Sequence, residues 1–182
     1  LLKVERQLLS ASRLGRSKST GMQLSSALPP ELYAFLDDPN LLGVSGHETR
    51  GHMSSDIARY LFAACFAAAE GLSPRSHQFP ERLAPNHKNW KSCKFNDRFR
   101  VQVDNAPAST VTSHISKDGH YYIHPDPKQC RSLTVREAAR IQTFPDNYHF
   151  MGNRTEQFTQ VGNAVPPFLA KQVAEALLPI FD

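Results

Sequence analysis

Thirteen prolines are spread through the 182 residues, and they limit the length that any regular element can reach. Proline lacks a backbone N–H and is tolerated in a helix only near the first turn, so each proline tends to begin or end an element. Hydrophobic residues make up 40% of the chain, which is enough for a core. The composition therefore predicts a loop-rich protein rather than a compact helical bundle.

Charge and hydropathy indicate a soluble protein of the cytoplasm. The formal net charge is +4, and no apolar run approaches the roughly 20 residues needed to cross a bilayer. Lys3, Glu5 and Arg6 lie where a signal peptide would be apolar. Because the first residue is Leu1 rather than Met, we also expect the chain to be a piece of a longer polypeptide.

Neither the cysteines nor the histidines are spaced like metal ligands. The cysteines are Cys65, Cys93 and Cys130. Without a C-x-x-C pair they are typical of free thiols in a reducing compartment. The histidines that could be grouped are His47 with His52, and His114 with His120 and His124. Zinc usually takes three or four ligands at short paired spacings, which neither group has, so we expect no metal site.

Apolar periodicity is strongest over residues 54–70, where it predicts a helix with Ser54 or Ser55 as its cap and Gly71 at its end. Its expected buried stripe is Ile57, Tyr60, Leu61, Ala64, Cys65 and Ala68. A shorter helix is expected to begin at Pro30 and to end before Pro39.

Two further helices are expected near the end of the chain. Thr134 and Glu137 form a T-x-x-E capping box, which opens a helix that Pro145 must close. Pro166 and Pro167 open the last one. Its expected apolar stripe is Leu169, Val173, Ala176, Leu177 and Ile180.

Alternating apolar and polar residues predict short strands between these helices. In residues 98–103, Phe99 and its apolar partners alternate with Arg98, Arg100 and Gln102. Residues 109–115 and 120–124 are expected to form two further strands, joined by a turn. Strands and helices together predict an α+β fold.

Two motifs near the end of the chain go beyond fold class. The first, RSLTVREAARIQTFPDNY, covers residues 131–148, and the second, QVGNAVPPFLA, covers residues 160–170. In sequence, order and spacing they resemble the last two conserved blocks of the DNA cytosine-5 methyltransferases. Upstream stretches from residues 50–64, 95–102 and 109–126 are similar to the variable target-recognition region of bacterial members, so the resemblance covers most of the chain from about residue 43.

The resemblance implies a division of the chain into three parts. Residues 1–42 would be a linker with a short helix, residues 43–130 a small, irregular mixed α/β target-recognition domain, and residues 131–182 a helical segment with the conserved motifs. In the family this last segment packs on a Rossmann-like methyltransferase domain, which this chain lacks. We therefore expect the stripe of the terminal helix to be solvent-exposed, self-associated or disordered.

The family's reactive groups have no counterpart here. Its nucleophile is a cysteine that follows a proline and attacks a cytosine turned out of the duplex. In this chain the cysteines follow Ala64, Ser92 and Gln129. The family's cofactor, S-adenosylmethionine, needs a Gly-rich turn, whereas the nine glycines form no G-x-G, and the Glu of the family's Glu-Asn-Val block is missing. The resemblance implies no catalytic residue in this chain and no activity for it alone.

DNA contact is implied for two regions. The loop from Thr110 to Gly119 offers hydroxyl, imidazole and ammonium groups, and the arginines of residues 98–103 suit guanine O6 and N7. The implied contacts are Arg98, Arg100, Thr112, His114, Ser116, Lys117 and, toward a phosphate, Arg131. The alternative is that a basic strand face and a polar turn form an ordinary solvated surface.

The two conserved motifs imply different roles. The first is architectural, with Arg136 and Arg140 facing outward or pairing with acidic groups. In the second, the resemblance implies that Asn163, Ala164 and Val165 contact S-adenosylmethionine once the catalytic half is attached. The alternative is a simple turn at residues 162–163 before the proline-led helix.

These expectations support two functions of different classes. The first is the DNA-recognition and cofactor-pocket-completing portion of a DNA (cytosine-5) methyltransferase, whose partners are double-stranded DNA and an N-terminal catalytic half on the same or a separate polypeptide. The alternative is a free-standing, non-catalytic DNA-binding or regulatory module, for which a charge of +4 is modest. A remnant without activity is a third possibility.

Overall fold

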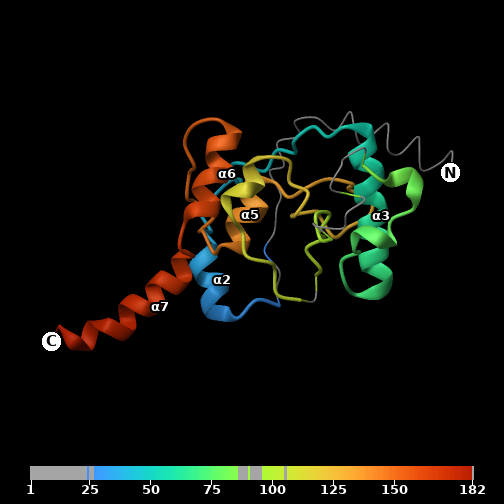
Figure 1. Ribbon diagram of the computed structural model, residues 1–182. Coiled ribbons are helices and arrows are strands. Elements are labelled where there is room, and N and C mark those ends of the chain that lie inside the picture. Colours follow the sequence, from blue (N-terminus) through green and yellow to red (C-terminus); the bar gives the residue numbers. More distant parts are fainter. Residues whose placement is uncertain (1–23, 25–26, 86–89, 91–95, 105, 182) are drawn as a thin grey trace. The chain divides into compact units, whose positions relative to one another are not determined.

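The computed structural model describes residues 24, 27–85, 90, 96–104 and 106–181 (Figure 1). The described residues form two compact units that interleave along the sequence. The first unit takes residues 49–110 and 118–133, and the second takes residues 27–48, 111–117 and 134–181. Among the described residues, no helix has both the length and the apolar character that crossing a membrane requires.

The first unit is built on α3, Ser54–Glu70, followed by two short 3-10 helices, η1 at Ser76–Gln78 and η2 at Glu81–Leu83. Gly71 ends α3 in the left-handed conformation, φ 70°, as expected. The N-terminal cap differs from the prediction, because the N-cap residue is Met53 and makes no side-chain capping bond.

The buried face of α3 is rotated from the predicted one. The residues buried on it are Asp56, Ile57, Tyr60, Ala63, Ala64 and Ala67. Cys65, expected in the core, is exposed, and Ala68 is exposed as well. The helix is apolar on most sides between residues 61 and 69, so periodicity could not decide which side packs. Aromatic side chains decide it, because Tyr60 packs with Phe79 and Phe99 in the core of this unit.

The predicted strands are replaced by two isolated bridges. In the described residues Val101 pairs in parallel with Ile123, and Ile123 pairs antiparallel with Ser132. The ladder stops after one pair because the chain turns just before Ile123, where the Tyr122 N–H donates to the Gly119 carbonyl at 2.9 Å. The expectation of strands at residues 98–103 and 120–124 was therefore wrong beyond these single pairings.

The second unit is helical. Its elements are α2 at Pro30–Leu36, η3 at Ser113–Ser116, α5 at Val135–Ile141, α6 at Arg154–Asn163, α7 at Pro167–Leu177 and η4 at Leu178–Ile180. The helices α2, α5 and α7 confirm the predictions, and the Thr134–Glu137 capping box is formed, with the Thr134 hydroxyl accepting from the Glu137 N–H at 3.2 Å. The strand expected at residues 109–115 is instead partly η3, because Ile115 is drawn back over Thr112 by a bond of 3.0 Å.

Arg136 on α5 is fully buried, which corrects the expectation that it faces outward or pairs with an acid. Its guanidinium donates to the carbonyls of Ser45, Pro145 and Tyr148 at 2.9, 3.0 and 2.7 Å, and to the Ser45 hydroxyl at 3.1 Å. These four bonds tie the distant loop at Ser45, and the segment that follows α5, to the helix. Arg140 does pair with an acid, donating to both carboxylate oxygens of Asp146 at 2.8 and 2.6 Å.

A close backbone approach holds η3 against α6. A Cβ on Gly162 would lie 2.3 Å from the Thr112 carbonyl carbon and 2.4 Å from the Ser113 nitrogen. Only a residue without a side chain lets the two backbones come so near. The alternative of a turn at residues 162–163 was wrong, because both residues complete the last turn of α6.

Candidate functional site

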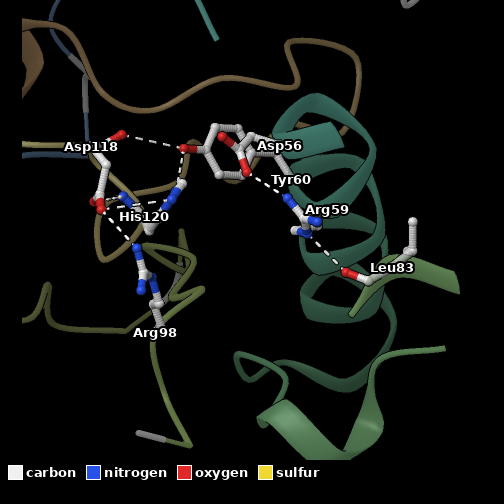
Figure 2. Close-up of polar contacts among 7 residues, drawn as sticks. All are labelled: Asp56, Arg59, Tyr60, Leu83, Arg98, Asp118 and His120. Atoms are coloured by element: carbon white, nitrogen blue, oxygen red, sulfur yellow. Dashed lines mark hydrogen bonds and ion pairs between the residues drawn. The ribbon is translucent and has the colours of Figure 1, made fainter. Parts of the chain in front are cut away.

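A row of hydrogen-bonded side chains runs from the core of the first unit to its surface (Figure 2). Buried Tyr60 on α3 meets His120, with 2.7 Å between the hydroxyl and Nδ1. The His120 main-chain N–H donates to Asp118 Oδ1 at 3.1 Å, and Arg98 donates to Asp118 Oδ2 at 3.1 Å. This row of hydrogen bonds therefore fixes the position of Arg98, which is one of the predicted DNA contacts.

Burial keeps Tyr60 and His120, the inner members of this row, uncharged. It raises the pKa of Tyr60 and lowers the pKa of His120, although the carboxylate of Asp118 acts in the opposite direction on His120. Burial also lowers the pKa of the neighbouring His52 to about 4, with a further contribution from Arg50. Neutral His52 accepts from the Ser132 N–H through Nε2 at 3.2 Å, which a protonated ring could not do.

A second polar group anchors α3 to η2. Arg59 donates to Asp56 Oδ1 at 2.7 Å and, through Nε, to the Leu83 carbonyl at 2.8 Å (Figure 2). Arg59 therefore holds η2 against α3, which is a structural role rather than a chemical one.

The predicted arginine contacts of the first unit are all engaged within the protein. Arg98 pairs with Asp118, and Arg100 pairs with Asp97, with side chains about two-fifths exposed. Arg131 donates to Gln129 Oε1 at 2.8 Å and to a main-chain carbonyl at 3.1 Å. Exposed ion pairs contribute only about 0–1 kcal/mol, so a phosphate can replace the carboxylates.

The other predicted DNA contacts lie in the second unit, on and around η3. Thr112, His114 and Lys117 are exposed, whereas the Ser116 hydroxyl is turned back and donates to the Ser113 carbonyl at 2.7 Å. The surface of η3 is held from behind by buried Ile115 and by the approach of α6 at Gly162.

The three residues proposed to contact the cofactor follow one another at the end of α6. Asn163 is exposed, Ala164 is half-buried in extended conformation, and Val165 is 66% exposed. An accessible amide beside an accessible apolar side chain fits a ligand with both polar and apolar parts.

The terminal helix α7 leaves the rest of its unit. Its first turn is held by an edge contact between Phe168 and Phe35, with ring centroids 5.2 Å apart. Lys171 in the second turn pairs with Glu31 of α2 at 3.5 Å, and beyond it the helix projects away from α2, α5 and α6 (Figure 1). The large apolar side chains exposed along it and η4 are Leu169, Val173, Leu177, Leu178 and Ile180, followed by Phe181.

Sequence reasoning missed two features of these sites. Helix α6 was not expected, although Asn153 and Glu156 form an N-x-x-E capping box that could have revealed it. The partnership of Tyr60 with His120 joins residues 60 positions apart, and no local pattern signals it.

Comparison with known proteins places these sites in context. The family described as C-5 cytosine-specific DNA methylase matches residues 48–178. The type II methyltransferase M.Bpa9945I of Bacillus paralicheniformis is 47% identical over 150 residues, which are 82% of this chain and 33% of that protein. The type II methyltransferase M.AplI of Arthrospira platensis is 55% identical over 75 residues, 39% of this chain and 21% of that protein. The chain thus spans about a third or less of the length of these relatives.

Proposed function

Because this chain belongs to the C-5 cytosine-specific DNA methylase family, we propose that it is the part of a DNA (cytosine-5) methyltransferase that recognises DNA and completes the cofactor pocket. The match over residues 48–178 extends through both compact units. The proposal includes that the chain alone transfers no methyl group, because it contains no cysteine preceded by proline.

The observation that carries the proposal is the uncovered apolar face of α7. Leu169 and Val173 are each 50% exposed, Leu177 is 45% exposed, and Ile180 is 73% exposed. A row of this kind at helical spacing is typical of a surface that another chain or domain covers. We assign the catalytic part of the methyltransferase as that partner, and burying each side chain further would contribute about 1–2 kcal/mol to docking.

S-adenosylmethionine supplies the methyl group in this family. In this chain Asn163, Ala164 and Val165 would hold one side of it, the amide through hydrogen bonds and the valine through apolar contact. Their positions are fixed by Gly162, which seats the end of α6 on the main chain of Thr112. Their task is to bind and orient the cofactor rather than to take part in bond making.

We assign DNA contact to the residues that the sequence analysis predicted for it. Arg98 and Arg100 of the first unit would read guanine edges in the major groove, and Arg131 would contact a phosphate. Thr112, His114, Ser116 and Lys117 of the second unit would contact phosphates or bases of the duplex. Phosphate contacts of this kind make binding weaken steeply as salt rises.

A domain exchange tests the proposal. The matched third of M.Bpa9945I is replaced by the corresponding 150 residues of this chain, and transfer of labelled methyl groups from S-adenosylmethionine to duplex DNA is measured. We expect 5-methylcytosine from the chimera and none from this chain alone. A folded chimera that binds S-adenosylmethionine but leaves DNA unmethylated, beside an active parent enzyme, contradicts the proposal.

A further inference from the structure

A cavity of about 610 Å³ lies in the first unit, beside the chain that leaves α3. Three segments line it: residues 71–78, residues 97–103 and residues 106–109. The volume falls within the range of about 300–1,000 Å³ that is usual for small-molecule sites. Of the predicted DNA contacts, only Arg100 lines it.

Several polar groups on the cavity wall are already bonded within the protein. The Ser73 hydroxyl donates to the Phe99 carbonyl at 3.3 Å and accepts from the Val101 N–H at 2.9 Å. Gln102 donates to a main-chain carbonyl at 2.8 Å, and its Oε1 accepts from the N–H and the hydroxyl of Ser109 at 3.0 and 3.1 Å. These bonds hold the wall in shape and leave those groups little capacity for a ligand.

Two arginines among the lining residues keep that capacity. Arg75 is exposed, and within the described residues no ion pair joins it to an acidic side chain. Arg100 pairs with Asp97, which also lines the cavity, but both side chains are about two-fifths exposed. An incoming phosphate can take the place of the Asp97 carboxylate, because charge-assisted bonds from arginine to phosphate are strong and bidentate.

Several of the remaining lining residues are apolar. Pro74 and Val101 are buried, whereas Val103 is half-buried and Ala106 and Pro107 are exposed, so these last three offer apolar surface to a ligand. A bare phosphate needs none of this surface and fills only a small part of the volume. A phosphate together with the sugar or base attached to it uses both the arginines and the apolar wall.

We propose that this cavity is a docking site for one nucleotide of the DNA substrate. Arg75 and Arg100 hold its phosphate, and Val103, Ala106 and Pro107 contact its nucleoside. Asp97 acts as an internal stand-in that occupies Arg100 until DNA arrives. The proposal rests on the proposed function and adds Arg75 and Asp97 to the residues that determine DNA binding.

The test is duplex binding by this chain, measured by fluorescence anisotropy with a fluorescein-labelled duplex of about 20 base pairs at low salt. R75Q and R100Q should each weaken binding about tenfold. Each should also reduce the slope of log affinity against log salt concentration by about one. D97N should strengthen binding about threefold, because a competing carboxylate is removed. R82Q is the matched control: Arg82 is exposed on η2 and does not line the cavity, so its loss should change affinity less than about twofold.

Hydrogen exchange locates the contact. Bound duplex should slow exchange in residues 71–78 and 97–103, whereas free deoxycytidine monophosphate at the same concentration should not. The proposal is overturned if wild type does not bind, if R75Q behaves like R82Q, or if the free nucleotide protects these residues and the duplex does not. Because methyl transfer by the domain-exchange chimera is a separate measurement, failure here leaves the proposed function standing.

Discussion

Replacing Gly162 by alanine sets two known effects against each other. Alanine favours a helix over glycine by about 1 kcal/mol, so at an open helical site the change would stabilise the protein. At Gly162 the new Cβ would lie 2.3 Å from the Thr112 carbonyl carbon and 2.6 Å from its oxygen. Ordinary contact begins near 3.4 Å, so the two backbones must separate by about 1 Å.

The magnitude follows from what blocks the methyl group. Overpacking costs about 1–3 kcal/mol when side chains can move aside, and more when they cannot. The obstacles here are main-chain atoms of Thr112 and Ser113, so we expect the upper end of that range. After the gain in helix propensity, G162A should lower the free energy of unfolding by about 2 kcal/mol, or the melting temperature by roughly 4–8 °C.

Urea unfolding followed by circular dichroism measures this difference directly. G51A is the matched control, because nothing lies within 4 Å of a Cβ at Gly51, and it should be neutral within about 0.5 kcal/mol. If G162A were as stable as wild type or more stable, the packing of α6 on η3 would not be as described.

Three further outcomes are expected. R136K should lower the free energy of unfolding by about 2–4 kcal/mol in the same urea assay, because one ammonium cannot replace a guanidinium that donates four bonds; stability equal to wild type would contradict its burial. The pKa of His52 is lowered from 6.5 to about 4, so as the pH falls the unfolded chain binds a proton before the folded one does. The free energy of unfolding should therefore be constant above pH 6.5 and fall by up to roughly 3 kcal/mol toward pH 4. H52Q should flatten this pH dependence. If the free energy of unfolding of H52Q changed between pH 7.5 and 5 as it does in wild type, His52 would not be the cause. At pH 8, iodoacetamide should modify exposed Cys65 before buried Cys130, whose pKa is raised to about 11 by burial; peptide mass spectrometry would expose the reverse order.

Local signals predicted α2, α3, α5 and α7, although not α6. Pro30, the capping box at Thr134 and the proline pair before α7 each act within one turn, so the sequence around them is sufficient. The same reasoning applies to the exposed stripe of α7, which was expected from its spacing and from the family resemblance.

What the sequence could not reveal depends on distant partners. Arg136 is buried because Ser45, 91 residues away, supplies two of its acceptors. The strand predicted around Val101 would need a neighbouring strand to pair with. The turn before Ile123 limits that pairing to one bridge. Arg75 carried no sequence signal at all, since its cavity forms only when residues 71–78 and 97–103 meet.

The central claim is that this chain completes a methyltransferase by docking through α7, and reconstitution from separate pieces tests it most directly. The two thirds of M.Bpa9945I outside the match are mixed, unfused, with this chain, and the 5-methyl-2′-deoxycytidine formed in duplex DNA is measured by mass spectrometry. We expect product with the wild-type chain and at least tenfold less with V173D, which charges the exposed apolar face without touching the core. V173D should unfold at the same urea concentration as wild type. Equal product from both chains, or none from the wild-type mixture when the fused chimera is active, would contradict the claim.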